Sequence, residues 1–237
     1  MQNTFRISLV LIISLFSITI YAQDWPNLKR YQAQNDSIMK APARDRVVFM
    51  GNSITEGWIK THPEFFHSST GNICRGIGGQ TSPQMVLRFR QDVINLKPKV
   101  VVILAGTNDI AGNTGPATLD MIMDNIKSMT ELAISNNIRV VLCSVLPAYE
   151  YRWRKGMKPY IKIPQLNAMI KAYAAKKRVV YLDYFSAMAD EKNAMKAEYT
   201  TDGVHCTSAG YDVMEAMVTP AIKKALKTKP RKKCKRY

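Results

Sequence analysis

The chain of 237 residues has 46% hydrophobic and 22% charged side chains, which is typical of a globular protein and excludes an intrinsically disordered one. Its 12 Gly and 11 Pro exclude collagen-like and low-complexity sequences, and its 4 Cys are too few for a disulfide scaffold. Lys and Arg number 34 against 18 Asp and Glu, so the net charge of +16 makes a nucleic-acid partner one hypothesis to weigh.

Residues Met1 to Ala22 are predicted to be a signal peptide. Arg6 precedes an apolar stretch from Ile7 to Ile20, which is shorter than the roughly 20 residues of a membrane span and fits the hydrophobic region of a signal peptide. Ala22 is the small residue expected at the cleavage point, although Ile20 matches the cleavage pattern weakly. The alternative is an uncleaved membrane anchor. We expect an exported protein, periplasmic or extracellular after cleavage near Ala22.

Short apolar segments alternate with segments of helical periodicity in the rest of the chain. The predicted strands are Val47–Met50, Asn72–Ile77, Val100–Ala105, Arg139–Ser144 and Val179–Asp183. Apolar residues at steps of three and four predict helices around Ser82–Leu96, Leu119–Ala133, Ile163–Tyr173 and Tyr211–Ile222. This alternation predicts an α/β fold with a parallel sheet, covered by helices on both faces.

We expect one domain at residues 45–226. Residues 23–44 are polar and are predicted to be an N-terminal extension that wraps the surface. Residues 227–237 form a basic C-terminal tail, and the stretch Lys223–Tyr237 carries nine Lys and Arg without an acid. Such a cluster can contact an anionic surface such as nucleic acid, lipid or acidic glycan. A solvated tail is favoured over a nucleic-acid site, because no aromatic residues interleave for base stacking.

The four cysteines show neither a CxxC motif nor the spacing of a Cys/His metal site, so neither a metal nor another cofactor is expected. They are Cys74, Cys143, Cys206 and Cys234. Cys74 and Cys143 lie in apolar, strand-like segments and are expected to be buried free thiols.

Ligands of parallel sheets bind at the carboxyl ends of the strands, so we expect the functional residues in the loops that follow the strands. Ser53 follows the first strand as a candidate nucleophile, or as a helix N-cap. Gly76 near the end of the second strand, and Gly78 and Gly79 after it, can expose backbone N–H groups, form a tight turn, or cradle a phosphate. Asn108 follows the third strand as an amide donor, or as a turn residue.

A fourth loop precedes the last helix and contains Asp202 and His205. Asp202 can direct its carboxylate to the imidazole Nδ1 and leave Nε2 as a base, although an incidental histidine in an acidic helix start is the alternative. The other histidines, His62 and His67, are expected at the surface. A nucleophile, amide donors and an Asp–His pair on separate loops of one sheet are what acyl transfer requires.

Four blocks of this chain resemble the SGNH (GDSL-type) esterases and acylhydrolases in order and spacing. The blocks are Gly51–Thr55 (GNSIT), Gly78–Thr81 (GGQT), Gly106–Asp109 (GTND) and Asp202–His205 (DGVH). The resemblance covers about Arg46 to Leu226. It is greatest to the branch that includes platelet-activating-factor acetylhydrolase-like proteins and bacterial exported esterases.

The resemblance implies Ser53 as nucleophile, His205 as general base and Asp202 as its orienting acid. It implies an oxyanion hole made by the backbone N–H groups of Ser53 and Gly79 and by the Asn108 amide. It also implies a flavodoxin-like three-layer α/β/α fold with about five parallel strands and no metal.

The chain departs from the family pattern at three positions. Asn52 replaces the acid of the GDS motif, so the support of that loop is in question. Gln80 stands where an Asp is common. Cys206 stands where a Pro commonly follows the histidine, and it places an oxidisable thiol beside the base.

The substrate is expected to be a carboxylic ester with a short acyl or O-acetyl group, carried by a small molecule or a glycan. The segment Leu146–Pro164 is rich in Tyr, Trp, Arg and Lys, which suits a sugar or an anionic glycan, or is an ordinary surface loop held by prolines. Alternatives are a lysophospholipase-type acylhydrolase and a non-catalytic module that binds anionic glycan. Nucleic acid is disfavoured, and the sequence does not indicate an oligomeric state.

Overall fold

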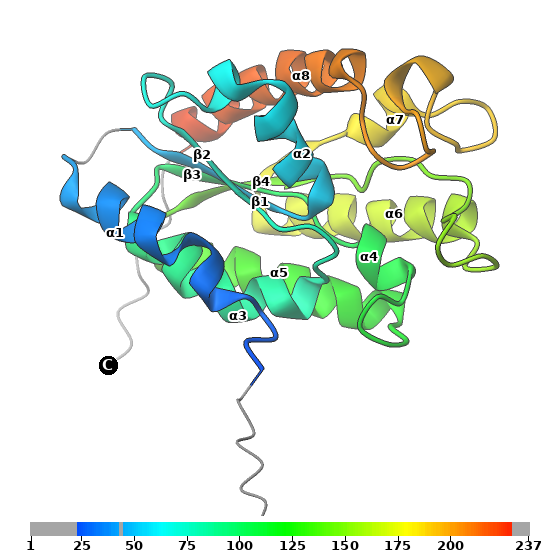
Figure 1. Cartoon of the computed structure of the whole chain (residues 1–237), viewed down its shortest axis with the longest axis horizontal. Coiled ribbons are helices and arrows are strands. Elements are labelled where there is room, and N and C mark those ends of the chain that lie inside the picture. Colours follow the sequence, from blue (N-terminus) through cyan, green and yellow to red (C-terminus); the bar gives the residue numbers. More distant parts are fainter. Residues whose placement is uncertain (1–22, 43–44, 229–237) are drawn as a thin grey trace, which may run out of the picture.

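The structure is a computed structural model that describes residues 23–42 and 45–228 (Figure 1). The predicted signal peptide and the basic tail beyond Thr228 lie outside these residues. Within the described part of the chain, no helix combines the length and the apolar character needed to cross a membrane.

The centre of the molecule is a parallel sheet of five strands in the order β2-β1-β3-β4-β5. The strands are β1 (Val47–Gly51), β2 (Asn72–Gly76), β3 (Val100–Ile103), β4 (Arg139–Cys143) and β5 (Val180–Leu182). Each lies where a strand was predicted, although β2 contains Asn72 and Arg75 and is less apolar than the others. The order is that of flavodoxin-like sheets, so the predicted fold class is confirmed.

Helices cover both faces of the sheet (Figure 1). One layer contains α2 (Ser53–Thr61), α7 (Tyr184–Met188) and α8 (Ser208–Lys227). The other contains α1 (Gln32–Lys40), α3 (Ser82–Asp92), α4 (Thr107–Ile110), α5 (Leu119–Ser135) and α6 (Pro159–Lys177). Short 3-10 helices are η1 (Leu28–Tyr31), η2 (Pro63–Phe66), η3 (Ile94–Leu96) and η4 (Ala197–Tyr199).

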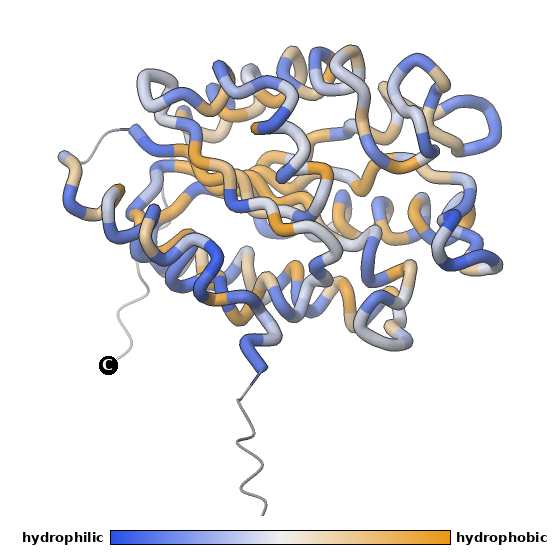
Figure 2. Tube along the Cα trace, viewed as in Figure 1, coloured by the Kyte–Doolittle hydropathy of each residue, from blue (hydrophilic) through white to orange (hydrophobic). Residues whose placement is uncertain are grey.

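Two hydrophobic clusters fill the space between the layers, one on each face of the sheet. Val48 and Met50 of β1 pack into the cluster of α3, α5 and α6, whereas Val47 and Phe49 pack into the cluster of α2 and α8. This alternation follows from the two-residue period of a strand. Figure 2 shows the hydrophobic residues concentrated in the sheet between the helices.

The polar N-terminal extension is more ordered than expected. It contains η1 and α1, and it buries Tyr31 and Asn35. The prediction of a surface wrap rested on the polar composition of this segment, which gave no sign that polar groups hold it to the domain.

The segment Leu146–Pro164 was predicted as a loop held by prolines, but its last six residues belong to α6, which begins at Pro159. Proline is well tolerated in a first helical turn. Pro164 lies further inside the helix and has no N–H to donate to the Tyr160 carbonyl. The Asn193 amide donates to that carbonyl instead, at 3.1 Å.

The prediction that His62 is a surface residue was wrong. Its side chain is buried between α2 and α8, with Nδ1 2.8 Å from Glu215 Oε1 and Nε2 2.8 Å from Ser208 Oγ. Trp58 Nε1 donates to the same Glu215 oxygen at 2.8 Å. The imidazole therefore joins the end of α2 to the first half of α8. His67 is exposed, as expected.

We expect His62→Ala to lower the free energy of unfolding by about 2 kcal/mol, because it removes hydrogen bonds to a carboxylate and a hydroxyl in a buried position. Urea denaturation measures the loss. The matched control is His67→Ala, which removes an exposed imidazole and should leave stability within about 0.5 kcal/mol of the parent. Equal losses in the two variants would contradict a structural role of His62.

Candidate active site

Three neighbouring strands end side by side and deliver three of the predicted loops to one edge of the sheet. Gly51 of β1 pairs with Gly76 of β2, and Met50 pairs with Ile103 of β3. At Gly76 an added Cβ would lie 2.3 Å from the Glu56 backbone N and 2.8 Å from the Asn52 carbonyl O. Glycine at this position therefore lets the end of β2 pack directly against the first turn of α2.

Ser53 occupies the first position of α2, and the residue that caps the helix is Asn52. The Asn52 Oδ1 accepts a hydrogen bond from Ile54 N at 3.0 Å, so the alternative of Ser53 as an N-cap was wrong. Because Asn52 satisfies the helix end, the Ser53 hydroxyl is left for other partners. Asn52 thus gives the loop the support that the absence of an acid had put in question.

The Ser53 hydroxyl faces His205, which lies 152 positions later in the sequence. The Ser53 Oγ is 2.9 Å from His205 Nε2, and His205 Nδ1 is 2.6 Å from Asp202 Oδ2. The structure therefore brings the predicted nucleophile, base and acid into one hydrogen-bonded row. In this row Nδ1–H donates to the carboxylate, and Nε2 can accept the serine proton.

Asp202 is held by several donors at once. Its Oδ1 accepts from the backbone N–H groups of His205, at 2.8 Å, and Val204, at 2.9 Å. Burial opposes ionisation, but the hydrogen bonds from the His205 ring and from these two amides outweigh it and lower the pKa of Asp202 to about 2. The carboxylate is therefore charged at neutral pH.

Thr200 is a supporting residue that the sequence did not reveal. Its hydroxyl donates to the His205 carbonyl at 2.7 Å and accepts from Gly203 N at 3.0 Å. These bonds close the turn that contains Asp202 and His205. A threonine two positions before an acidic turn is a weak sequence signal, because such turns commonly recruit a hydroxyl for local hydrogen bonds.

The predicted oxyanion donors lie on the loops after β2 and β3. Gly79 has a φ of +74°, in the left-handed region that glycine adopts without strain. The neighbouring Gly78 donates its N–H to Glu56 Oε2 at 2.8 Å, and a Cβ on Gly78 would lie 3.9 Å from Ser53 Cβ. The loop therefore runs beside the serine.

Asn108 is buried and is oriented by a backbone carbonyl. Its Nδ2 donates to the Gln80 carbonyl at 2.9 Å. An amide nitrogen carries two hydrogens, so the second one is left for another acceptor. Asn108 is thus a fixed donor rather than a turn residue with positive φ, which was the alternative.

Asp109, the last residue of the GTND block, joins two of the loops. Its carboxylate accepts from Ser82 N at 2.9 and 3.0 Å and from Ser82 Oγ at 2.5 Å. Burial raises the pKa of Asp109 despite these hydrogen bonds. The contact holds the start of α3, and with it the loop that contains Gly79, against the loop that contains Asn108.

The remaining departures from the family pattern also have local explanations. The Gln80 side chain donates to the Pro26 carbonyl and accepts from Arg88. Burial raises the pKa of the Cys206 thiol to about 12, which disfavours the thiolate and the oxidation expected beside the base. Cys74 and Cys143 are buried free thiols, as predicted, and Cys234 lies outside the described residues.

Among the residues that the structure describes, no cluster of three His, Cys, Asp or Glu side chains could hold a metal ion.

We expect Asn52→Ala to lower the free energy of unfolding by about 1 kcal/mol, because it leaves the first turn of α2 uncapped. Asn52→Asp should stay within about 0.5 kcal/mol of the parent, since a carboxylate also caps a helix and favours its positive end. Urea denaturation of the two variants distinguishes the cap from side-chain packing. Similar losses in both would argue that the amide is needed for another contact.

Comparison with known proteins identifies the family. Residues 49–213 match the model of the GDSL-like Lipase/Acylhydrolase family. A candidate acylhydrolase from Bacteroides fragilis NCTC 9343 is 52% identical, with a TM-score of 0.83 over 86% of this chain and 100% of that one. A structure described as a candidate platelet activating factor from Streptococcus pneumonia shares the fold, with a TM-score of 0.68 at 23% identity over 84% and 92% of the chains.

The curated relative that matches is an uncharacterized lipoprotein, YqeF, of Bacillus subtilis (strain 168). It is 35% identical over 78 residues, so the match covers 32% of this chain and 32% of the relative. The family model, in contrast, covers more than half of this chain and includes all four predicted blocks. The chain belongs to the GDSL-like lipase/acylhydrolase family, and it is a hydrolase of ester bonds.

Proposed function

We propose that the protein is a serine esterase that cleaves a carboxylic ester through an acyl-enzyme on Ser53. The observation that supports this most directly is the unbroken row of hydrogen bonds from the Ser53 hydroxyl through His205 to Asp202. A base in contact with a nucleophile, itself oriented by a carboxylate, is the arrangement that makes a serine hydroxyl reactive.

The proposed reaction begins when His205 Nε2 takes the Ser53 proton as the oxygen attacks the ester carbonyl. The negative charge on the carbonyl oxygen is met by the backbone N–H groups of Ser53 and Gly79 and by the Asn108 amide. The charge of Asp202 stabilises the imidazolium that forms. His205 then protonates the leaving alcohol, and water repeats the cycle on the acyl-enzyme.

For the substrate, we propose a short acyl group, such as O-acetyl, carried by a carbohydrate. Trp153 and Tyr149 leave 46% and 51% of their surface exposed, and Tyr149 stacks on Tyr160 with ring centroids 4.7 Å apart. Exposed aromatic planes offer an apolar surface with polar edges, which suits a sugar ring.

Trp153 is also connected to the loop that contains Gly79. Its Nε1 donates to Asn113 Oδ1 at 3.1 Å, and Asn113 Nδ2 donates to the Gly79 carbonyl at 3.2 Å. If the Trp153 ring binds the alcohol part of the ester, Asn113 connects it through two hydrogen bonds to Gly79, the proposed oxyanion donor. Arg152, Arg154 and Lys155 flank Trp153 and favour an anionic glycan.

We also propose that the protein is exported. The proposal rests on the apolar stretch within residues 1–22 and on the lipoprotein name of the curated relative. An exported esterase would meet the O-acetylated polysaccharides of cell surfaces and of the surrounding medium.

The test of the reaction is hydrolysis of p-nitrophenyl acetate beside p-nitrophenyl octanoate by the chain from Gln23 onward. We expect turnover of the acetate, and a fall in kcat of about 10⁶-fold in Ser53→Ala, because the nucleophile is lost. A preference for octanoate would favour the lysophospholipase-type activity. Equal absence of activity in parent and variant on both esters would contradict a general esterase and favour the glycan-binding module.

The test of the substrate class is Trp153→Ala. We expect kcat/KM on an O-acetylated oligosaccharide to fall about tenfold, because one aromatic contact with the sugar is lost. The value for p-nitrophenyl acetate, which has no sugar, should stay within about twofold of the parent. An equal loss on both esters would mean that Trp153 acts through Asn113 and Gly79 rather than on the carbohydrate.

A further inference from the structure

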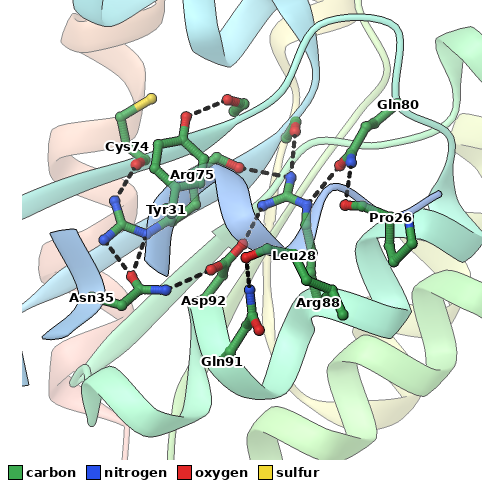
Figure 3. Close-up of polar contacts among 12 residues, drawn as sticks. Pro26, Leu28, Tyr31, Asn35, Cys74, Arg75, Gln80, Arg88, Gln91 and Asp92 are labelled. Atoms are coloured by element: carbon green, nitrogen blue, oxygen red, sulfur yellow. Dashed lines mark hydrogen bonds and ion pairs between the residues drawn. The ribbon is translucent and has the colours of Figure 1, made fainter. Parts of the chain in front are cut away.

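A cluster of buried polar side chains lies between the N-terminal segment, defined here as residues 24–40, and the carboxyl ends of β1 and β2 (Figure 3). Arg75, Arg88 and Asp92 are 2%, 0% and 0% exposed, and Asn35 is 4% exposed. Burying charges is costly even when they are paired. A cluster of this kind therefore points to a task that apolar packing would not perform.

Arg88 contacts the segments on both sides of the proposed active site. Its guanidinium donates to the Gly51 carbonyl at 3.0 Å, the Arg75 carbonyl at 2.8 Å and Gln80 Oε1 at 2.6 Å, and it pairs with Asp92 at 3.0 Å. Gly51 lies two positions before Ser53, and Gln80 follows Gly79 directly. A planar group with fixed donor directions thus sets the spacing between these two segments.

Gln80 is the point at which the cluster meets the proposed oxyanion donors. Its backbone carbonyl accepts from Asn108, and its side-chain oxygen accepts from Arg88. Its side-chain nitrogen donates to the Pro26 carbonyl of the N-terminal segment at 2.7 Å. Figure 3 shows the Gln80 amide between Arg88 and Pro26. Only a group that both accepts and donates can make these two contacts, and a carboxylate cannot.

Other hydrogen bonds hold the N-terminal segment next to Gln80. Asn35 Nδ2 donates to Asp92 Oδ1 at 2.7 Å, and Asn35 Oδ1 accepts from Arg75 Nη2 at 2.6 Å. The Tyr31 hydroxyl donates to the Gly76 carbonyl. Gln84 Nε2 donates to the Trp25 carbonyl at 2.7 Å, while its oxygen accepts from Thr81 N at 3.0 Å.

We propose that Gln80 is a positioning residue, and that the N-terminal segment holds it against Arg88 so that Gly79 and Asn108 keep their place beside Ser53. The N-terminal segment is then a working part of the active site rather than an extension. The proposal rests on the proposed function, because it assigns a purpose to the placement of Gly79 and Asn108. Misplacement of a reacting group by about 1 Å can cost on the order of 10²-fold in rate.

The decisive variant is Gln80→Glu, which keeps an acceptor for Arg88 but replaces the donor to the Pro26 carbonyl with a second acceptor. The matched control is Gln91→Glu, which breaks a similar hydrogen bond from Gln91 Nε2 to the Leu28 carbonyl. That bond holds the same N-terminal segment, also shown in Figure 3, but Gln91 lies outside the Gly78–Thr81 loop.

On p-nitrophenyl acetate, we expect kcat of Gln80→Glu to fall about 10²-fold with KM within about twofold, because the loss concerns transition-state contacts. Gln91→Glu should keep both values. A kcat of Gln80→Glu within twofold of the parent, or equal losses in the two variants, would overturn the proposal. Should Gln80→Glu not fold, Gln80→Met removes both side-chain hydrogen bonds at similar size and is expected to give the same kcat loss.

A second readout does not depend on esterase activity. The side-chain amide of Asn108 donates to the Gln80 carbonyl and is not adjacent to Gln80 in the sequence, so its ¹H–¹⁵N NMR resonances should shift or broaden in Gln80→Glu and stay in place in Gln91→Glu. Unchanged Asn108 side-chain resonances in Gln80→Glu would overturn the positioning role. If the parent shows no Ser53-dependent hydrolysis but the Asn108 resonances move as expected, the proposed function fails while the positioning role stands.

Discussion

The structure depends on one geometric constraint: parallel strands all end at the same edge of the sheet. Because β2, β1 and β3 are neighbours, the loops that contain Gly79, Ser53 and Asn108 meet at that edge without any long excursion of the chain. His205 lies just before α8, and the packing of α8 on α2 brings it to the same edge. Tyr211 of α8 stacks on Trp58 of α2 and donates its hydroxyl to the Ile54 carbonyl at 2.8 Å, so α8, which follows His205, is held against the helix that begins with Ser53.

The sequence allowed the sheet to be predicted because burial on both faces demands continuous apolar runs, as in Val100–Ile103, and few other structures do. It allowed α5 and α8 to be predicted because each buries one apolar face. The same logic could not find α1, whose buried residue is the polar Asn35. It could not place His62 either, whose ring nitrogens have partners 146 and 153 positions away. Long-range polar pairing leaves no periodic trace in a sequence.

In the candidate site, too, local sequence patterns predicted some residues, and long-range contacts hide others. Ser53, Asp202 and His205 could be proposed from short local patterns, and the structure brings them together. The residues that hold them could not be proposed. Thr200 closes a turn through a single hydroxyl, and Asp109 reaches Ser82 across 27 positions. Such contacts depend on residues that are close only in the folded protein. A sequence pattern at one position does not indicate which side chain is needed there.

The connection between β5 and α8 is long, from Asp183 to Thr207, and it delivers Asp202 and His205 to the site. Connections of this length usually need internal structure or an anchor to stay in one place. Pro164 inside α6 supplies such an anchor, because it donates no hydrogen bond to the Tyr160 carbonyl, which instead accepts one from the Asn193 amide in the middle of this connection. The carbonyl that Pro164 leaves without a helical donor thus anchors the middle of the segment that contains His205 to α6.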